Sequence, residues 1–125
     1  MALKQDELIK IVEKILSLDD QMRFAAIIDL KGNIVEGIMK EGKSSLESQK
    51  QEELFCKQVA DRRKMRESFN DELGKVRFVN VEREKVTQIV VYSKKKTVFV
   101  TMEPEITFEK KSDIINNIKK LTLNL

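Results

Sequence analysis

Residues 76–81 read V-R-F-V-N-V, residues 86–92 read V-T-Q-I-V-V-Y, and residues 97–102 read T-V-F-V-T-M. β-branched and aromatic side chains fill all three runs, as the pleated and packed surface of a sheet favours. Only residues 82–85 and 93–96 separate the runs, whereas a parallel crossover needs a dozen residues or more. The stretch therefore predicts three antiparallel strands in a meander.

A shorter pair of strands is predicted before the meander. Residues 23–29 (R-F-A-A-I-I-D) form a nearly continuous apolar run, which indicates a strand covered on both faces. Gly32 allows a tight turn, and residues 33–39 (N-I-V-E-G-I-M) return as the second strand of a hairpin. Gly37 inside that strand predicts a bulge or the close approach of another backbone.

Three helices are predicted around these strands. Residues 3–18 carry apolar side chains at three- and four-residue steps, which is typical of a helix with one face on a core. Residues 45–69 contain neither Gly nor Pro, and Ser44 and Glu47 have the spacing of a capping box, so we expect one long helix. After an irregular linker at residues 105–111, anchored on the core through Ile106 and Phe108, Ser112 marks the start of a last helix.

The composition narrows the functional classes. The chain of 125 residues is 36% charged and has one cysteine and no histidine, so a structural zinc site and a Cys–His nucleophile are excluded. Cys56 is interpreted as a small apolar residue. We expect a single domain over residues 1–125 in a reducing, cytoplasmic setting, with no catalytic residues, metal site, cofactor or membrane span.

The long helix has a thin apolar stripe that arginine interrupts. Arg62 and Arg66 fall on the broad face shared by Phe55, Val59 and Phe69, and such a helix needs support beyond its own monomer. Arginine near a helix seam is well suited to pair with acids across an interface. This helix supplies six of our candidate interface residues: Leu54, Phe55, Val59, Arg62, Arg63 and Arg66.

The basic run at residues 62–66 (R-R-K-M-R) has other interpretations. Residues 1–56 hold 8 basic and 11 acidic side chains, whereas residues 57–125 hold 16 and 10. A solvated helix face explains such a run, and an anionic partner is the alternative. Nucleic acid is disfavoured, because little aromatic interleaving is available for base stacking.

Residues 37–44 (G-I-M-K-E-G-K-S) match the phosphate-binding pattern G-x4-G-K-[ST] letter for letter. The strand before them belongs to a hairpin, however, and Ile38 and Met39 continue it. A phosphate loop instead leaves a parallel strand, with a magnesium-binding acid on a neighbouring strand. We interpret the segment from Gly37 to Ser44 as a chance match and keep nucleotide binding as an alternative.

The hairpin residues 24–35 (F-A-A-I-I-D-L-K-G-N-I-V), set within the element order α-β-β-α-β-β-β-α, resemble the roadblock/LC7 domain family, a relative of the profilin-like and longin folds. The resemblance covers nearly the whole chain. It implies an α+β fold with a five-stranded antiparallel sheet, the first and last helices on one face and the long helix on the other.

The resemblance also implies a function. Roadblock proteins are scaffolds and regulators of small GTPases or motors, without an active site of their own. They dimerise by laying the long helices side by side and joining sheets through the first meander strand, here residues 45–69 and 76–81. The resemblance therefore adds Val79 and Val81 to the candidate interface residues. A homodimeric interaction module is therefore expected; a PAS-like or profilin-like sensor for a small ligand or peptide is the alternative.

Overall fold

The computed structural model describes residues 4–125. The elements follow the expected order, with one additional short helix. They are α1 (Gln5–Leu16), β1 (Met22–Asp29), β2 (Ile34–Met39), α2 (Gln49–Glu67), α3 (Asn70–Leu73), β3 (Val79–Glu82), β4 (Thr87–Tyr92), β5 (Lys96–Met102) and α4 (Phe108–Leu121).

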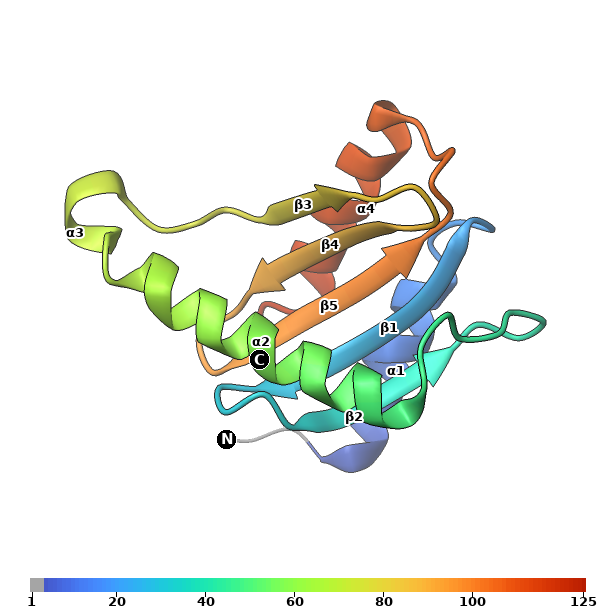
Figure 1. The fold of residues 1–125 in the computed structure, drawn as a ribbon, viewed down its shortest axis with the longest axis horizontal. Helices are drawn as coiled ribbons and strands as arrows, with labels where there is room; N and C mark the ends of the chain where they lie inside the picture. The colour runs from blue at the N-terminus through green and yellow to red at the C-terminus, as the bar shows by residue number, and fades with distance from the viewer. Residues whose placement is uncertain (1–3) are drawn as a thin grey trace.

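The five strands form one sheet in the order β2-β1-β5-β4-β3, and every neighbouring pair is antiparallel. Helix α2 crosses one face of this sheet, and α1 and α4 cover the other (Figure 1). The expected α+β fold, with helices on both faces, is confirmed. Strands β2 and β3 are the two edges of the sheet.

Two apolar cores lie on the two faces of the sheet, because successive residues of a strand point to opposite sides. Ala25 and Ile27 of β1 face α1 and α4, where Val12, Ile15 and Ile118 are fully buried. The neighbouring residues of β1 face α2. The buried core on that side consists of Phe24, Ala26, Ile28, Cys56, Val59, Val90 and Phe99.

Helix α2 is shorter than the expected span of residues 45–69. It begins at Gln49, and the capping box joins Ser48 and Gln51 rather than Ser44 and Glu47. Both pairs have the same sequence spacing, so the pattern alone could not choose between them. Residues 40–48 form a connector along the surface instead.

Two other boundaries were predicted wrongly. Strand β3 covers Val79–Glu82 rather than residues 76–81, since the chain is still crossing from α3 at residues 75–78. Helix α4 begins at Phe108, with the Thr107 side chain as its N-cap, so residues 108–111 are not a linker. Ile106 is buried as expected, but Phe108 is exposed.

The β-bulge predicted at Gly37 lies two residues before it, at Val35. The β1–β2 register shifts between Ile27, paired with Glu36, and Ile28, paired with Ile34, so Val35 is the extra residue. Gly37 itself pairs with Ala26. A Cβ at Gly37 would lie 3.2 Å from Cζ of Phe24, so a side chain rather than another backbone approaches it closely.

Candidate functional site

A groove lies between α2 and the edge strand β3, and we call it the arginine groove. Its volume is about 230 Å³, and Val59, Val90 and Phe99 form its apolar floor. Six of the eight predicted interface residues line it: Phe55, Val59, Arg62, Arg66, Val79 and Val81. The long helix and the first meander strand are therefore neighbours in the monomer.

Three arginines stand around this groove. Nη1 of Arg66 donates to the Tyr92 hydroxyl at 2.9 Å, and Nε of Arg83 donates to Oε1 of Gln88 at 3.0 Å. Arg62 is exposed and forms no ion pair with any residue of 4–125. Since guanidinium groups stay protonated at all physiological pH values, the groove is a positively charged rim around an apolar floor.

Strand β3 directs its side chains alternately to the two faces of the sheet. Val79 and Val81 face the arginine groove, whereas Glu82 pairs with the buried Lys111 of α4 on the opposite face. The hydrogen bond from Lys111 lowers the pKa of Glu82. Because this pair fixes β3 against α4, the outer edge of β3 is held in place and has no strand beside it in residues 4–125.

Arg63 was assigned to the candidate interface, but it does not line the groove. Its side chain is 5% exposed, and Nη1 donates to the Lys96 carbonyl oxygen at 2.8 Å and to the Thr97 hydroxyl at 3.0 Å. Nη2 donates to the Ser93 carbonyl oxygen at 2.5 Å. The guanidinium also lies 4.8 Å from the centre of the Tyr92 ring. Arg63 therefore anchors α2 to the β4–β5 turn inside the monomer.

Leu54 lies outside the groove, on the outer face of α2. It is 58% exposed, and Met65 on the same face is 62% exposed. Residues 54, 58, 61 and 65 follow three- and four-residue steps and so share one side of the helix. Two large apolar side chains are thus presented to solvent at the two ends of this stripe.

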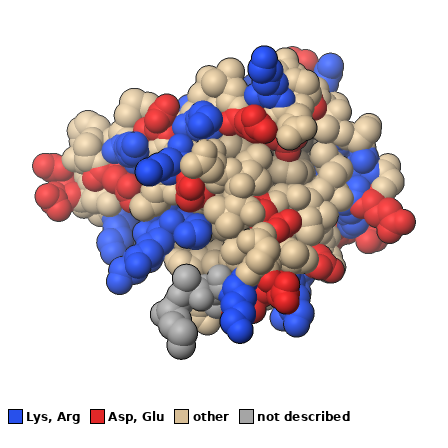
Figure 2. Space-filling view, turned by 90° about the horizontal axis from the view of Figure 1, so that it is seen from below, with Lys and Arg blue, Asp and Glu red and all other residues tan. Residues whose placement is uncertain are grey.

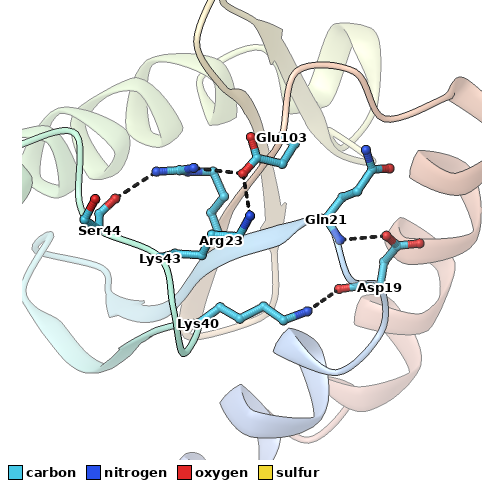
Figure 3. A network of polar contacts seen from close by, with 7 residues as sticks. All are labelled: Asp19, Gln21, Arg23, Lys40, Lys43, Ser44 and Glu103. Carbon is cyan, nitrogen blue, oxygen red and sulfur yellow. Dashed lines mark hydrogen bonds and ion pairs between the residues drawn. The ribbon is translucent and has the colours of Figure 1, made fainter.

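The segment from Gly37 to Ser44 does not have the geometry of a phosphate loop. Gly37 to Met39 lie in β2, and α2 begins only at Gln49. Figure 3 shows instead that Lys43 and Arg23 both reach Oε1 of Glu103, each at 2.8 Å. Nη2 of Arg23 also donates to the Ser44 carbonyl oxygen at 2.8 Å. The lysine that would hold a phosphate is engaged in tying the connector to the sheet.

Cys56 faces the core of the α2 side and is fully buried. Burial raises the pKa of its thiol to about 12, and Glu52 and Glu47 add to the effect. A thiol with so high a pKa is protonated at neutral pH and is a poor nucleophile. The interpretation of Cys56 as an apolar core residue agrees with this geometry. Among residues 4–125 no three Cys, Asp or Glu side chains come together as a metal site.

Two features of the α2 face were not predicted. Arg83 was assigned to a turn, yet the register of β3 on β4 brings it to the arginine groove. A larger cavity, of about 790 Å³, lies on the other flank of α2 against the β1–β2 hairpin. No local pattern marks it, because Phe24, Met39 and Glu52 come from three separate elements.

Solved structures with this fold define its class. The gliding protein MglB of Thermus thermophilus superposes with a TM-score of 0.79 at 11% identity, covering 98% of this chain and 91% of that one. The roadblock/LC7 domain from Streptomyces avermitilis gives 0.64 at 10% identity, with 92% and 97% covered. Profilin II of Acanthamoeba castellanii gives 0.58 at 15% identity, with 90% and 93% covered. The fold is that of roadblock/LC7 domains, as the resemblance implied.

Within this class, the chain belongs to the family described as "Family of unknown function (DUF6659)", whose model matches residues 4–123. No curated protein matches the sequence. No helix of residues 4–125 has both the length and the apolar character needed to cross a bilayer.

Proposed function

We propose that this protein is a non-enzymatic interaction module that forms a homodimer through α2 and β3, and that the paired surface binds a protein partner such as a small GTPase. The arginine groove carries the proposal. It combines an apolar floor, a charged rim and the open edge of β3 on one side of the molecule. A second copy covers all three at once.

Symmetry supports the pairing of two α2 helices. In a two-fold contact, a residue pair formed by one position of the first copy and another position of the second copy is repeated with the copies exchanged. An antiparallel pair of α2 helices centred between Val59 and Ala60 places Leu54 of one copy beside Met65 of the other, twice per dimer. Both side chains are more than half exposed in the monomer, and their burial against each other contributes about 1.5–3 kcal/mol per fully covered side chain.

Strand β3 supports the same arrangement. An exposed strand edge pairs readily with another strand, and native proteins usually cover or protect it. Strand β3 has four residues, and its groove-facing valines are 79 and 81. Pairing of two β3 edges extends both sheets into one and brings the arginine grooves to the common face.

The protein partner rests on the family resemblance. Roadblock domains regulate small GTPases, and MglB has also been solved with a tetrameric arrangement, so assemblies of this fold larger than a dimer occur. The inert Cys56 thiol and the engaged Lys43 side chain support a non-enzymatic role for this chain. The arginine rim favours a partner surface rich in carboxylates.

The test is molar mass by light scattering on a sizing column. We expect wild type at about twice 14.6 kDa and the Arg62→Glu/Arg66→Glu variant at 14.6 kDa. The control, Lys10→Glu/Lys120→Glu, makes the same charge change on exposed positions of α1 and α4 and should remain dimeric. Circular dichroism checks that all three proteins are folded. A monomeric wild type contradicts the proposal.

Ligand sensing is a second candidate function. The cavity of about 790 Å³ on the β2 flank of α2 has the size of a small-molecule site, and it lies between sheet and helix as the sensor alternative requires. This flank is separate from the arginine groove, so the two functions are compatible in one molecule.

A further inference from the structure

The cavity on the β2 flank, called here the β2-side cavity, has an apolar floor and an acidic wall. Phe24 of β1 and Ile34 and Met39 of β2 supply apolar side chains from the sheet. Glu52 and Glu53 supply carboxylates from α2. Figure 2, seen from below Figure 1, shows a largely uncharged central area with both acidic and basic side chains around it.

The acidic wall is not neutralised by the chain itself. Within residues 4–125 neither Glu52 nor Glu53 forms an ion pair, and Glu53 accepts only a 3.4 Å hydrogen bond from Gln49. Partial burial and the nearby Glu47 raise the pKa of Glu52. Lys57 lines the cavity too, without an ion pair to either glutamate. The wall therefore favours a cationic group from outside the chain.

The ends of the cavity favour a small molecule over a continuous peptide. At one end Gly32 packs so closely on α2 that a Cβ there would lie 2.6 Å from Cα of Lys57. At the other end Ser45 belongs to the connector, which the Arg23 contact to Ser44 holds over the sheet (Figure 3). An extended peptide needs open ends, whereas a volume of about 790 Å³ fits one small ligand.

We propose that the β2-side cavity binds a small organic cation with an apolar chain. The chain packs on Phe24, Ile34 and Met39, and the ammonium or guanidinium group pairs with Glu52 and Glu53. This inference rests on the second candidate function, ligand sensing, and names its ligand class. It is independent of the homodimer, because the cavity and the arginine groove lie on opposite flanks of α2.

At Gly37 a substitution can add a side chain to the floor of the cavity. It faces the same side of β2 as Ile34, and a Cβ there would lie 3.2 Å from Cζ of Phe24 and 3.3 Å from Cγ2 of Ile34. Both neighbours are side-chain atoms that can yield slightly, and valine is favoured in strands. Gly37→Val therefore places a side chain on the cavity floor where the apolar chain of the ligand would lie.

The test is a titration of the isotope-labelled protein with n-hexylammonium chloride, followed by backbone amide NMR shifts. We expect saturable shifts confined to the residues that line the cavity. Because each buried methylene group tightens binding about fourfold, n-butylammonium should bind about fifteenfold more weakly than n-hexylammonium. Heptanoate and hexanol, with the same hexyl chain and no positive charge, separate the effect of charge from that of the apolar chain.

Two variants locate the site. Glu52→Gln should weaken n-hexylammonium binding about fivefold, and Gly37→Val should weaken it at least tenfold. Glu72→Gln, at an exposed glutamate of α3, makes the same charge change away from the cavity and should bind as wild type does. If Gly37→Val does not fold, Glu52→Gln alone decides the location.

The results of this titration separate the preference for a cation from the ligand-sensing function. Heptanoate or hexanol binding as tightly as n-hexylammonium overturns the cation preference but leaves a ligand cavity. No saturable shift with any probe overturns the ligand-sensing function as well. Neither result bears on the homodimer, which light scattering measures separately.

Discussion

The replacement Arg63→Met tests whether one buried arginine holds α2 on the sheet. Methionine keeps the length and apolar stem of the side chain but removes the guanidinium. That group donates to the carbonyl oxygens of Ser93 and Lys96, which lie 30 and 33 residues away in the sequence. Without it, the one hydrogen bond in the described chain that still joins the second half of α2 to this region of the sheet is that of Arg66 to Tyr92, near the end of β4.

The size of the effect follows from what each acceptor retains. The Lys96 oxygen keeps bonds from the Ser93 amide at 2.9 Å and the Ser93 hydroxyl at 2.8 Å, whereas the Ser93 carbonyl oxygen and the buried Thr97 hydroxyl lose their only hydrogen-bond partner within residues 4–125. A hydrogen bond to a charged group contributes about 1.5–3 kcal/mol, and bonds from one group do not add fully. We therefore expect a loss of about 3 kcal/mol in the free energy of unfolding. For a chain of this size that lowers Tm by roughly 10–15 °C.

The assay is urea unfolding followed by circular dichroism at one protein concentration, with thermal unfolding as a second measure. Lys64→Met is the matched control, because Lys64 is the next residue in α2 and is exposed. Its loss should change stability by less than about 0.5 kcal/mol. If Arg63→Met costs under 1 kcal/mol by this measure, or no more than Lys64→Met, the anchoring role is refuted.

Three further predictions concern single positions. Hydrogen bonds from Lys43 and Arg23 lower the pKa of Glu103. The ionised Glu103 carboxylate therefore stabilises the fold at pH values above the ordinary carboxyl pKa, and this stabilisation is lost as the pH falls through the lowered pKa. Wild type should lose its stability advantage over Glu103→Gln below about pH 4. Cys56, whose pKa is raised to about 12, should resist iodoacetamide at pH 8 until urea unfolds the chain; rapid native labelling, measured by mass spectrometry, contradicts this. Gly32→Ala should cost over 2 kcal/mol, because φ is +91° and Cα of Lys57 blocks the methyl group; Gly42→Ala, at φ +84° with open space, should cost less in the same urea assay.

Local chemistry made the sheet predictable. In residues 86–102, β-branched side chains and short charged turns are consistent with one another, and β4 and β5 appear where they were expected. The starts of α2 and α4 were not predictable in this way. Ser44 and Ser48 head equally good capping boxes, and the choice depends on Arg23 holding the connector at Ser44. Thr107 caps α4 without an acid three residues later, so no capping-box pattern marked it.

The candidate site was predictable as a place but not in its detail. The family resemblance implied a dimer surface made of α2 and the first meander strand, and six of the eight candidate residues line the arginine groove. The predicted rotation of α2 about its axis was off by one residue. The apolar pattern used for the prediction counts every arginine as exposed. The buried face is Cys56, Val59, Ala60 and Arg63, which turns Arg62 outward to the groove.

The face that α2 buries changes the argument for a partner. A thin apolar stripe on α2 suggested that the helix needs support from outside the monomer. Part of that support is internal, since Arg63 bonds to the β4–β5 turn and covers the Tyr92 ring. What the monomer leaves uncovered around α2 is the outer stripe with Leu54 and Met65, Phe69 and Leu73 just beyond the end of the helix, and the edge of β3. Self-association is therefore expected to depend on those side chains and on Arg62, while the stability of α2 on the sheet depends on Arg63. A variant series in which Arg63→Met lowers the free energy of unfolding and Leu54→Ala only separates the copies distinguishes these two roles.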